Sequence, residues 1–125
     1  MADNKWQQFK SSRYRLRDLG RPAVFLIPLK KLRRRVGGMT IEDRLHRFLV
    51  ANFTAYTSSS IPSFGVWKDP EQKMVLDESR QYAVSFKGKD RIPLLLEELA
   101  HIATLAGEEC IYFEAGQYAC LVYPH

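Results

Sequence analysis

The clearest pattern along the chain is the helical spacing of apolar residues in two stretches. The first comprises Ile41, Leu45, Phe48, Leu49, Phe53 and Tyr56. Apolar residues that recur every three or four positions form one face of a helix. Thr40 precedes this stripe and Asp43 follows three residues later, close to a capping box. The spacing predicts a helix over Thr40–Ala55, which ends where the hydroxyl side chains of residues 57–60 favour hydrogen bonds to the backbone.

The second helical stretch comprises Ile92, Leu95, Leu96, Leu99, Ile102, Ala103 and Ala106. Asp90 lies where an N-cap belongs, and Pro93 falls in the first turn, where a missing N–H is tolerated. Gly107 follows the stripe at a position typical of a left-handed helix terminus. These signals predict a helix over Asp90–Ala106.

Strand patterns flank and separate the helices. The apolar run from Ala23 to Leu29 predicts a first strand, which Pro28 either ends or confines to a sheet edge. The next two predicted strands are Ile61–Lys68 and Val75–Lys87, joined by the turn-forming residues 69–72. Alternation in the last of these places Tyr82, Val84 and Phe86 on one face, and Gln81, Ala83, Ser85 and Lys87 on the other.

The C-terminus predicts a β-hairpin, Cys110–Phe113 and Tyr118–Tyr123, around an Ala115-Gly116 turn. In that register Cys110 and Cys120 point to opposite faces of the hairpin, so no disulfide is expected between them. Both thiols are expected to be reduced and to pack as small buried hydrophobes.

These elements follow the order β-α-β-β-α-β with one extra terminal strand. In a chain of 125 residues, that order is best satisfied by an antiparallel sheet with both helices on one face, the ferredoxin-like arrangement. We therefore expect an α+β fold in which residues 21–125 form a single domain. Residues 1–20 lack clear periodicity and are expected to form a basic arm.

Basic residues concentrate near the N-terminus. The first 36 residues contain eleven Lys or Arg against two Asp or Glu, whereas the remaining 89 contain eight against twelve. A cationic segment beside a folded domain usually contacts a polyanion or an acidic surface. We expect phosphate contacts from Arg13, Arg15, Arg17, Lys30, Lys31, Arg33, Arg34 and Arg35. The alternative is a solvated segment that keeps the protein soluble.

Two strands resemble the RNA recognition motif family. Val24-Phe25-Leu26-Ile27-Pro28-Leu29 is similar to its first-strand motif, with proline in place of the usual asparagine. Residues 80–86 partly resemble its third-strand motif, but lack the glycine and one aromatic position. In that family, aromatic residues of these strands stack on bases. The resemblance implies base contacts from Tyr82 and Phe86, and the alternative is that these rings, with Phe25, pack in the core.

A second resemblance extends from Thr40 to the end. A first helix, the Gly65-Val66-Trp67 strand, a charged strand, a second helix and the Cys110-Ile111-Tyr112-Phe113 strand are similar to small bacterial ferredoxin-like proteins of uncharacterised function. This likeness is architectural and implies no reaction.

Candidate chemistry is sparse. His46, His101 and His125 lack metal-ligand spacing, and the hydroxyl groups of residues 57–60 lack an adjacent base. We therefore expect no catalytic residue, no metal and no cofactor. A small-molecule pocket, if present, would be lined by Trp67, Glu78, Arg80, Tyr82 and Glu114, although carboxylates beside an arginine more often form a structural ion pair.

The sequence thus predicts a non-catalytic binding protein whose favoured partner is nucleic acid, either RNA or DNA. The first alternative is an accessory or assembly protein whose basic arm docks on an acidic protein surface. A ferredoxin-like ligand-binding or enzymatic dimer ranks last. Two cysteines are too few for a disulfide framework, and no apolar run reaches the roughly 20 residues of a membrane span. We expect a cytoplasmic location and no membrane partner, and the oligomeric state stays open.

Overall fold

The computed structural model describes residues 5–59, 63–68 and 74–125. In this part of the chain the helices are η1 (Lys5–Phe9), η2 (Leu29–Lys31), α1 (Ile41–Asn52) and α2 (Arg91–Ala106), of which η1 and η2 are short 3-10 helices. The strands are β1 (Arg21–Pro28), β2 (Arg35–Val36), β3 (Met39–Thr40), β4 (Ala55–Ser58), β5 (Ser63–Lys68), β6 (Met74–Phe86), β7 (Ile111–Ala115) and β8 (Tyr118–Val122). The predicted order is present, with β4 and the short β2–β3 hairpin in addition.

Helix α1 begins where the capping pattern predicts. The Thr40 Oγ1 accepts a hydrogen bond from the Asp43 N–H at 3.0 Å. The helix ends at Asn52, because Phe53 is already extended with φ −127° and ψ 155°. The predicted end at Ala55 is wrong, because the chain from that residue onward pairs with β6 as strand β4.

Helix α2 ends where the sequence predicts. Gly107 has φ 70°, and its N–H bonds to the carbonyls of Ala103 and Thr104. A left-handed terminus of this kind favours glycine. The predicted N-cap is not formed, because Asp90 has helical dihedral angles and its side chain makes no capping hydrogen bond. Among the described residues, no helix has both the length and the apolar character needed to cross a membrane.

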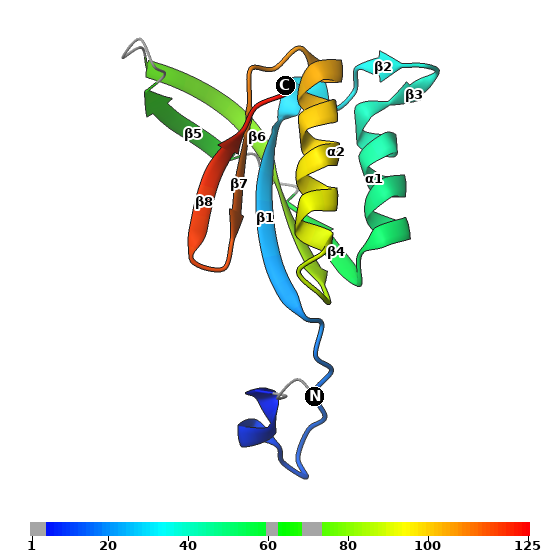
Figure 1. The fold of residues 1–125 in the computed structure, drawn as a ribbon, viewed down its shortest axis with the longest axis vertical. Helices are drawn as coiled ribbons and strands as arrows, with labels where there is room; N and C mark the ends of the chain where they lie inside the picture. The colour runs from blue at the N-terminus through cyan, green and yellow to red at the C-terminus, as the bar shows by residue number, and fades with distance from the viewer. Residues whose placement is uncertain (1–4, 60–62, 69–73) are drawn as a thin grey trace.

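The sheet has the strand order β4-β6-β1-β7-β8, and β5 also pairs with β6. Each of these pairs is antiparallel. Strand β1 is central and ends at Pro28, as predicted. Both α-helices lie on the same side of the sheet (Figure 1). The predicted ferredoxin-like α+β arrangement, with one extra terminal strand, is confirmed.

The hydrophobic core lies between the sheet and the two α-helices. Strand β1 contributes the fully buried Phe25, and β6 contributes Tyr82 and Phe86, which are 3% and 1% exposed. Phe25 pairs directly with Tyr82, and their rings stack with centroids 5.2 Å apart. The helices contribute Leu45, Leu49, Leu95, Leu99 and Ile102. Tyr82 and Phe86 therefore cannot stack on RNA bases, and the alternative of core packing is confirmed.

The C-terminal hairpin forms in a different register from the predicted one. Ala115 pairs with Tyr118, so the two turn residues are Gly116 and Gln117, one position later than expected. Gly116 has φ 60°, a left-handed conformation that glycine adopts without steric cost. The position of Gly116 therefore sets the position of the turn. The alternation of apolar residues alone did not predict which two residues form it.

The shifted register still leaves the cysteines unbridged. Cys120 pairs with Phe113 in the edge strand β8, and neither Cys110 nor Cys120 forms a disulfide, as predicted. Cys120 is exposed and Cys110 is half-buried, so the prediction that both are buried hydrophobes is wrong.

Candidate functional site

The densest basic run, Lys30 to Arg35, is partly built into the fold. Its single leucine is 1% exposed and belongs to the core. Lys31 Nζ lies 3.8 Å from Glu108 Oε1, and Arg34 Nη1 donates to the Ala106 carbonyl at 3.0 Å. The last turn of a helix presents unpaired carbonyls and partial negative charge, so these cations stabilise the end of α2. This structural role was not predicted.

The other predicted phosphate-binding cations are exposed: Arg13, Arg15, Arg17, Lys30, Arg33 and Arg35. The Arg35 guanidinium donates to the Gly38 carbonyl at 3.2 Å, within the β2–β3 hairpin. The cations of residues 13–17 precede β1 and those of residues 30–35 follow it, so the two groups lie at opposite ends of this strand. They do not form one continuous basic patch.

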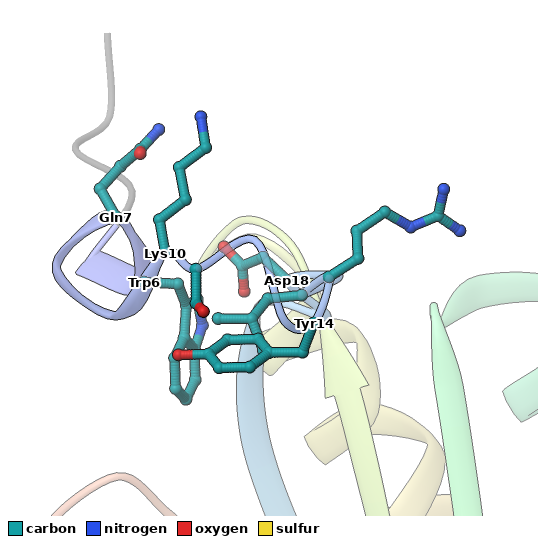
Figure 2. A pocket seen from close by; sticks show the side chains of 8 residues that line it. Trp6, Gln7, Lys10, Tyr14 and Asp18 are labelled. Atoms are coloured by element: carbon teal, nitrogen blue, oxygen red, sulfur yellow. The ribbon is translucent and has the colours of Figure 1, made fainter.

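The N-terminal arm, residues 5–20, contains a surface hollow of about 430 Å³. Its lining consists of Trp6, Gln7, Lys10, Ser11, Tyr14, Arg15, Leu16 and Asp18. Figure 2 shows the rings of Trp6 and Tyr14 close together, with the Lys10 side chain extending away from them. The hollow is aromatic and basic. The arm that forms it lies beyond the end of the sheet (Figure 1).

The residues predicted to line a small-molecule pocket are not brought together. Arg80 and Tyr82 lie on the helix-covered face of β6, whereas the register of β7 with β1 places Glu114 on the opposite face. Glu78 is exposed. The side chain of Trp67 lies outside the described residues. The predicted pocket combined residues from both faces of the sheet and is therefore wrong as a single site.

A different group of polar side chains gathers between α1, β4 and β6. The Arg80 guanidinium of β6 donates to the Glu42 carboxylate in the first turn of α1. One turn further along α1, His46 Nδ1 contacts the Tyr56 hydroxyl from β4. The Tyr56 ring lies 6.2 Å from the Tyr82 ring. The side chains of Arg80 and Glu42 are 25% and 43% exposed, so a ligand can reach the pair from solvent.

Both tyrosines of this polar cluster keep their protons at neutral pH. Burial raises the pKa of Tyr82 to about 12, and the nearby Glu42 carboxylate acts in the same direction. Burial and the Glu42 carboxylate also raise the pKa of Tyr56. The two phenols are therefore neutral hydrogen-bonding groups and not bases. The Tyr56 hydroxyl can donate to His46 Nδ1 whenever that nitrogen is unprotonated.

The cluster suits a ligand that carries both signs of charge. The Glu42 carboxylate can accept hydrogen bonds from an ammonium group, and the planar Arg80 guanidinium can bind a carboxylate at two points. The face of the half-buried Tyr56 ring attracts a further cation. A zwitterion with an additional positive centre matches these three groups.

Most of this cluster was not predicted from the sequence. Glu42 and His46 are four residues apart and share one face of α1, which is a readable signal once the helix is assigned. Tyr56 was assigned to the apolar stripe of the helix, because β4 was not predicted. Only Arg80 and Tyr82 were named as candidate pocket residues.

No family model and no curated protein matches the chain. Among solved structures, a phage SAM lyase in complex with S-methyl-5'-thioadenosine is similar, with a TM-score of 0.58 and 16% identity over 90% of this chain and 96% of that chain. A phage SAM lyase in the apo state gives a TM-score of 0.55 and 15% identity, over 88% and 96% of the two chains. At this identity the likeness concerns the fold.

These neighbours overturn the functional prediction. The sequence favoured a non-catalytic nucleic-acid-binding protein, with an accessory protein as the first alternative, whereas both structural neighbours are lyases and therefore enzymes. The prediction failed for two reasons seen in the structure. Part of the basic run stabilises the end of α2, and the two aromatic residues of the RNA-recognition resemblance are buried in the core.

Proposed function

We propose that this protein is an enzyme that cleaves S-adenosylmethionine (SAM) as a lyase. The observation that carries the proposal is the similarity in fold to phage SAM lyase over 90% of the chain. The polar cluster of Glu42, His46, Tyr56, Arg80 and Tyr82 supports it independently, because its groups match the substrate. The ammonium and carboxylate of SAM form a zwitterion, and its sulfonium is an additional cation. These are the charges that the cluster can bind.

The Glu42–Arg80 pair binds the amino-acid end of the substrate. The substrate ammonium contacts the Glu42 carboxylate while its carboxylate contacts the Arg80 guanidinium, so each protein charge gains an opposite charge. The half-buried Tyr56 ring lies beside this pair and receives the sulfonium by a cation–π contact. His46 orients the Tyr56 hydroxyl through its Nδ1.

The reaction breaks the bond between the sulfonium sulfur and the aminobutyrate carbon, and the electron pair of that bond goes to sulfur. Sulfur loses its charge and S-methyl-5'-thioadenosine is released. A lyase consumes no water, so the aminobutyrate fragment completes its valence internally. Either its own carboxylate oxygen bonds to the carbon and closes a lactone, or the neighbouring carbon releases a proton to solvent as a C=C bond forms. The two resulting fragments are isomers, which NMR separates.

The test is incubation of the purified chain with SAM, followed by mass spectrometry of the products. We expect S-methyl-5'-thioadenosine and a fragment that lacks the mass of an added water. Because SAM decays without an enzyme, heat-denatured protein in the same buffer provides the baseline. Turnover no faster than this baseline at micromolar protein would refute the proposed activity. A fragment that is already hydrated at the earliest time points, before a lactone can hydrolyse in the buffer, would refute the lyase assignment.

Variants test the roles of the polar cluster. Glu42→Gln and Arg80→Met each remove one charge-assisted contact, and we expect kcat/KM to fall by roughly 10- to 100-fold. Glu97→Gln and Arg47→Met replace exposed residues of the same types on the helices and serve as matched controls. Thermal melts establish that each variant is folded. Full activity in the folded Glu42 and Arg80 variants would place the active site elsewhere.

A further inference from the structure

The exposed apolar side chains of the described chain concentrate in the arm, residues 5–20. Five of its large side chains are between 37% and 52% exposed: Trp6, Phe9, Tyr14, Leu16 and Leu19. The rest of the described chain adds four more: Val36, Val50, Tyr118 and Tyr123. Apolar groups gathered on one exposed segment are typical of a surface that contacts another molecule.

The arm holds these side chains in a defined arrangement. The ring centroids of Trp6 and Phe9 are 6.0 Å apart, and the Tyr14 hydroxyl donates to the Phe9 carbonyl. Ser11 and Tyr14 form an isolated β-bridge, which closes the loop seen in Figure 2. A surface that is arranged before binding loses less conformational entropy when it docks.

The direction of the arm is set by Gly20. This residue has φ 95°, and a Cβ atom there would lie 2.1 Å from the Phe86 carbonyl oxygen. The Asp18 carboxylate accepts a hydrogen bond from the Gly20 N–H at 2.9 Å. Figure 1 shows the arm beyond the end of the sheet, pointing away from it. The arm of one chain therefore does not cover either face of its own sheet.

The sheet face opposite the α-helices offers a complementary surface. The strand register places five half-buried residues on it: Val24, Leu26, Ala83, Tyr112 and Leu121. Glu114 also lies on this face and accepts a hydrogen bond from the Tyr112 hydroxyl at 2.7 Å. The face therefore combines these apolar residues with the polar Gln81 and Ser85 and with the Glu114 carboxylate.

Charge also favours contact between the arm and the rest of a second chain. Residues 5–20 contain five Lys or Arg against one Asp, whereas residues 37–125 contain eight against twelve. We propose that the arm of one copy docks on the helix-free sheet face of a second copy. Its aromatic and leucine side chains pack on the half-buried aliphatic residues, and its arginines approach Glu114. This interface does not depend on the proposed catalytic activity.

Sedimentation of the intact chain at tens of micromolar tests the proposal, and we expect a multimer. The combined variant Trp6→Ser, Tyr14→Ser and Leu16→Ser should sediment as a folded monomer, whereas Val50→Ser, an exposed apolar position on α1, should keep the multimer. On the receiving face, Ala119→Lys adds a cation opposite Glu114 and should also give a monomer.

Cys120→Lys is the matched control for the receiving face, because it adds the same charge one residue along β8, on the other side of the sheet. It should leave the multimer intact. A monomeric intact chain, or a multimer that survives the arm variant, would overturn the proposal. A multimer that survives Ala119→Lys, or that is lost in Cys120→Lys, would overturn the sheet face as the docking surface.

Discussion

The arm and the sheet both contain aromatic rings among basic side chains. The rings of the arm are exposed to solvent, whereas those of the sheet strands β1 and β6 are buried. The arm rings Phe9 and Tyr14 are exposed, whereas the sheet rings Phe25 and Tyr82 are buried under the helices. A strand places alternate side chains on opposite faces, so a ring on the covered face is buried whatever its neighbours carry. The arm pairs with no strand of the sheet in the described chain, and its rings have no such cover.

The basic residues differ in their contacts. Arg34 is exposed like Arg13, Arg15 and Arg17 of the arm, but its guanidinium donates to the Ala106 carbonyl at the end of α2. A cation near a helix C-terminus interacts with unpaired carbonyls, and an exposed cation interacts mainly with water. Clustering of charge along the chain therefore says little about which charges are available to a partner.

The largest expected difference concerns the rings. Phe25→Ala should lower the free energy of unfolding by about 3–5 kcal/mol, because a fully buried ring leaves a cavity. At protein concentrations low enough for the chain to be monomeric, Phe9→Ala should change it by less than about 0.5 kcal/mol, because the ring is exposed in the arm of the single chain. Urea denaturation followed by circular dichroism measures both. Similar losses in the two variants would mean that the arm packs on the fold.

The next difference concerns alkaline pH. Burial raises the pKa of Tyr82 from 10.0 to about 12, so its neutral phenol contributes stability that is complete below pH 10. The unfolded chain loses this proton first, and roughly 2–3 kcal/mol should therefore be lost as pH rises from 10 to 12. Urea midpoints should fall across this range.

Two variants separate the Tyr82 contribution from general alkaline effects. Tyr82→Phe removes the titrating phenol and should reduce the decrease in urea midpoint between pH 10 and 12. Tyr118→Phe removes a phenol that is 80% exposed and should leave the profile unchanged. An unchanged profile in Tyr82→Phe would show that other groups cause the alkaline loss.

The smallest difference concerns the arginines. Arg34→Met removes the hydrogen bond to the Ala106 carbonyl and should lower the free energy of unfolding by about 0.5–1.5 kcal/mol. Arg33→Met, at the exposed neighbouring position, should change it by less than about 0.5 kcal/mol. Thermal denaturation at low ionic strength provides the comparison. Equal effects would argue against a special role for Arg34 at the end of α2.

Local signals in the sequence predicted the helices well. Thr40 caps α1 through Asp43, and Gly107 ends α2 in a left-handed conformation. Each of these contacts joins residues a few positions apart, so the chain encodes them directly. Alternation also placed Tyr82, Val84 and Phe86 on one face, which is the face that the structure buries.

Strand β4, the hairpin register and the polar cluster were not predicted. The four residues of β4, which follow α1, pair with β6. This pairing supplies the backbone hydrogen bonds that a short polar segment cannot form within itself. The hairpin turn moved by one position to place Gly116 where the backbone needs a positive φ. Tyr56 joined His46 only because β4 runs beside α1.

The sequence by itself determined the two helices, the start of α1, the end of α2 and the alternation of the long strand, because helical spacing, capping and pleating act over neighbouring residues. The tertiary structure decided which face of the sheet is covered, which cations are engaged and which polar groups meet. The Arg34–Ala106 contact joins residues 72 apart, and the Glu42–Arg80 pair joins residues 38 apart. Contacts over such separations depend on how the elements pack, and no local pattern along the chain records them.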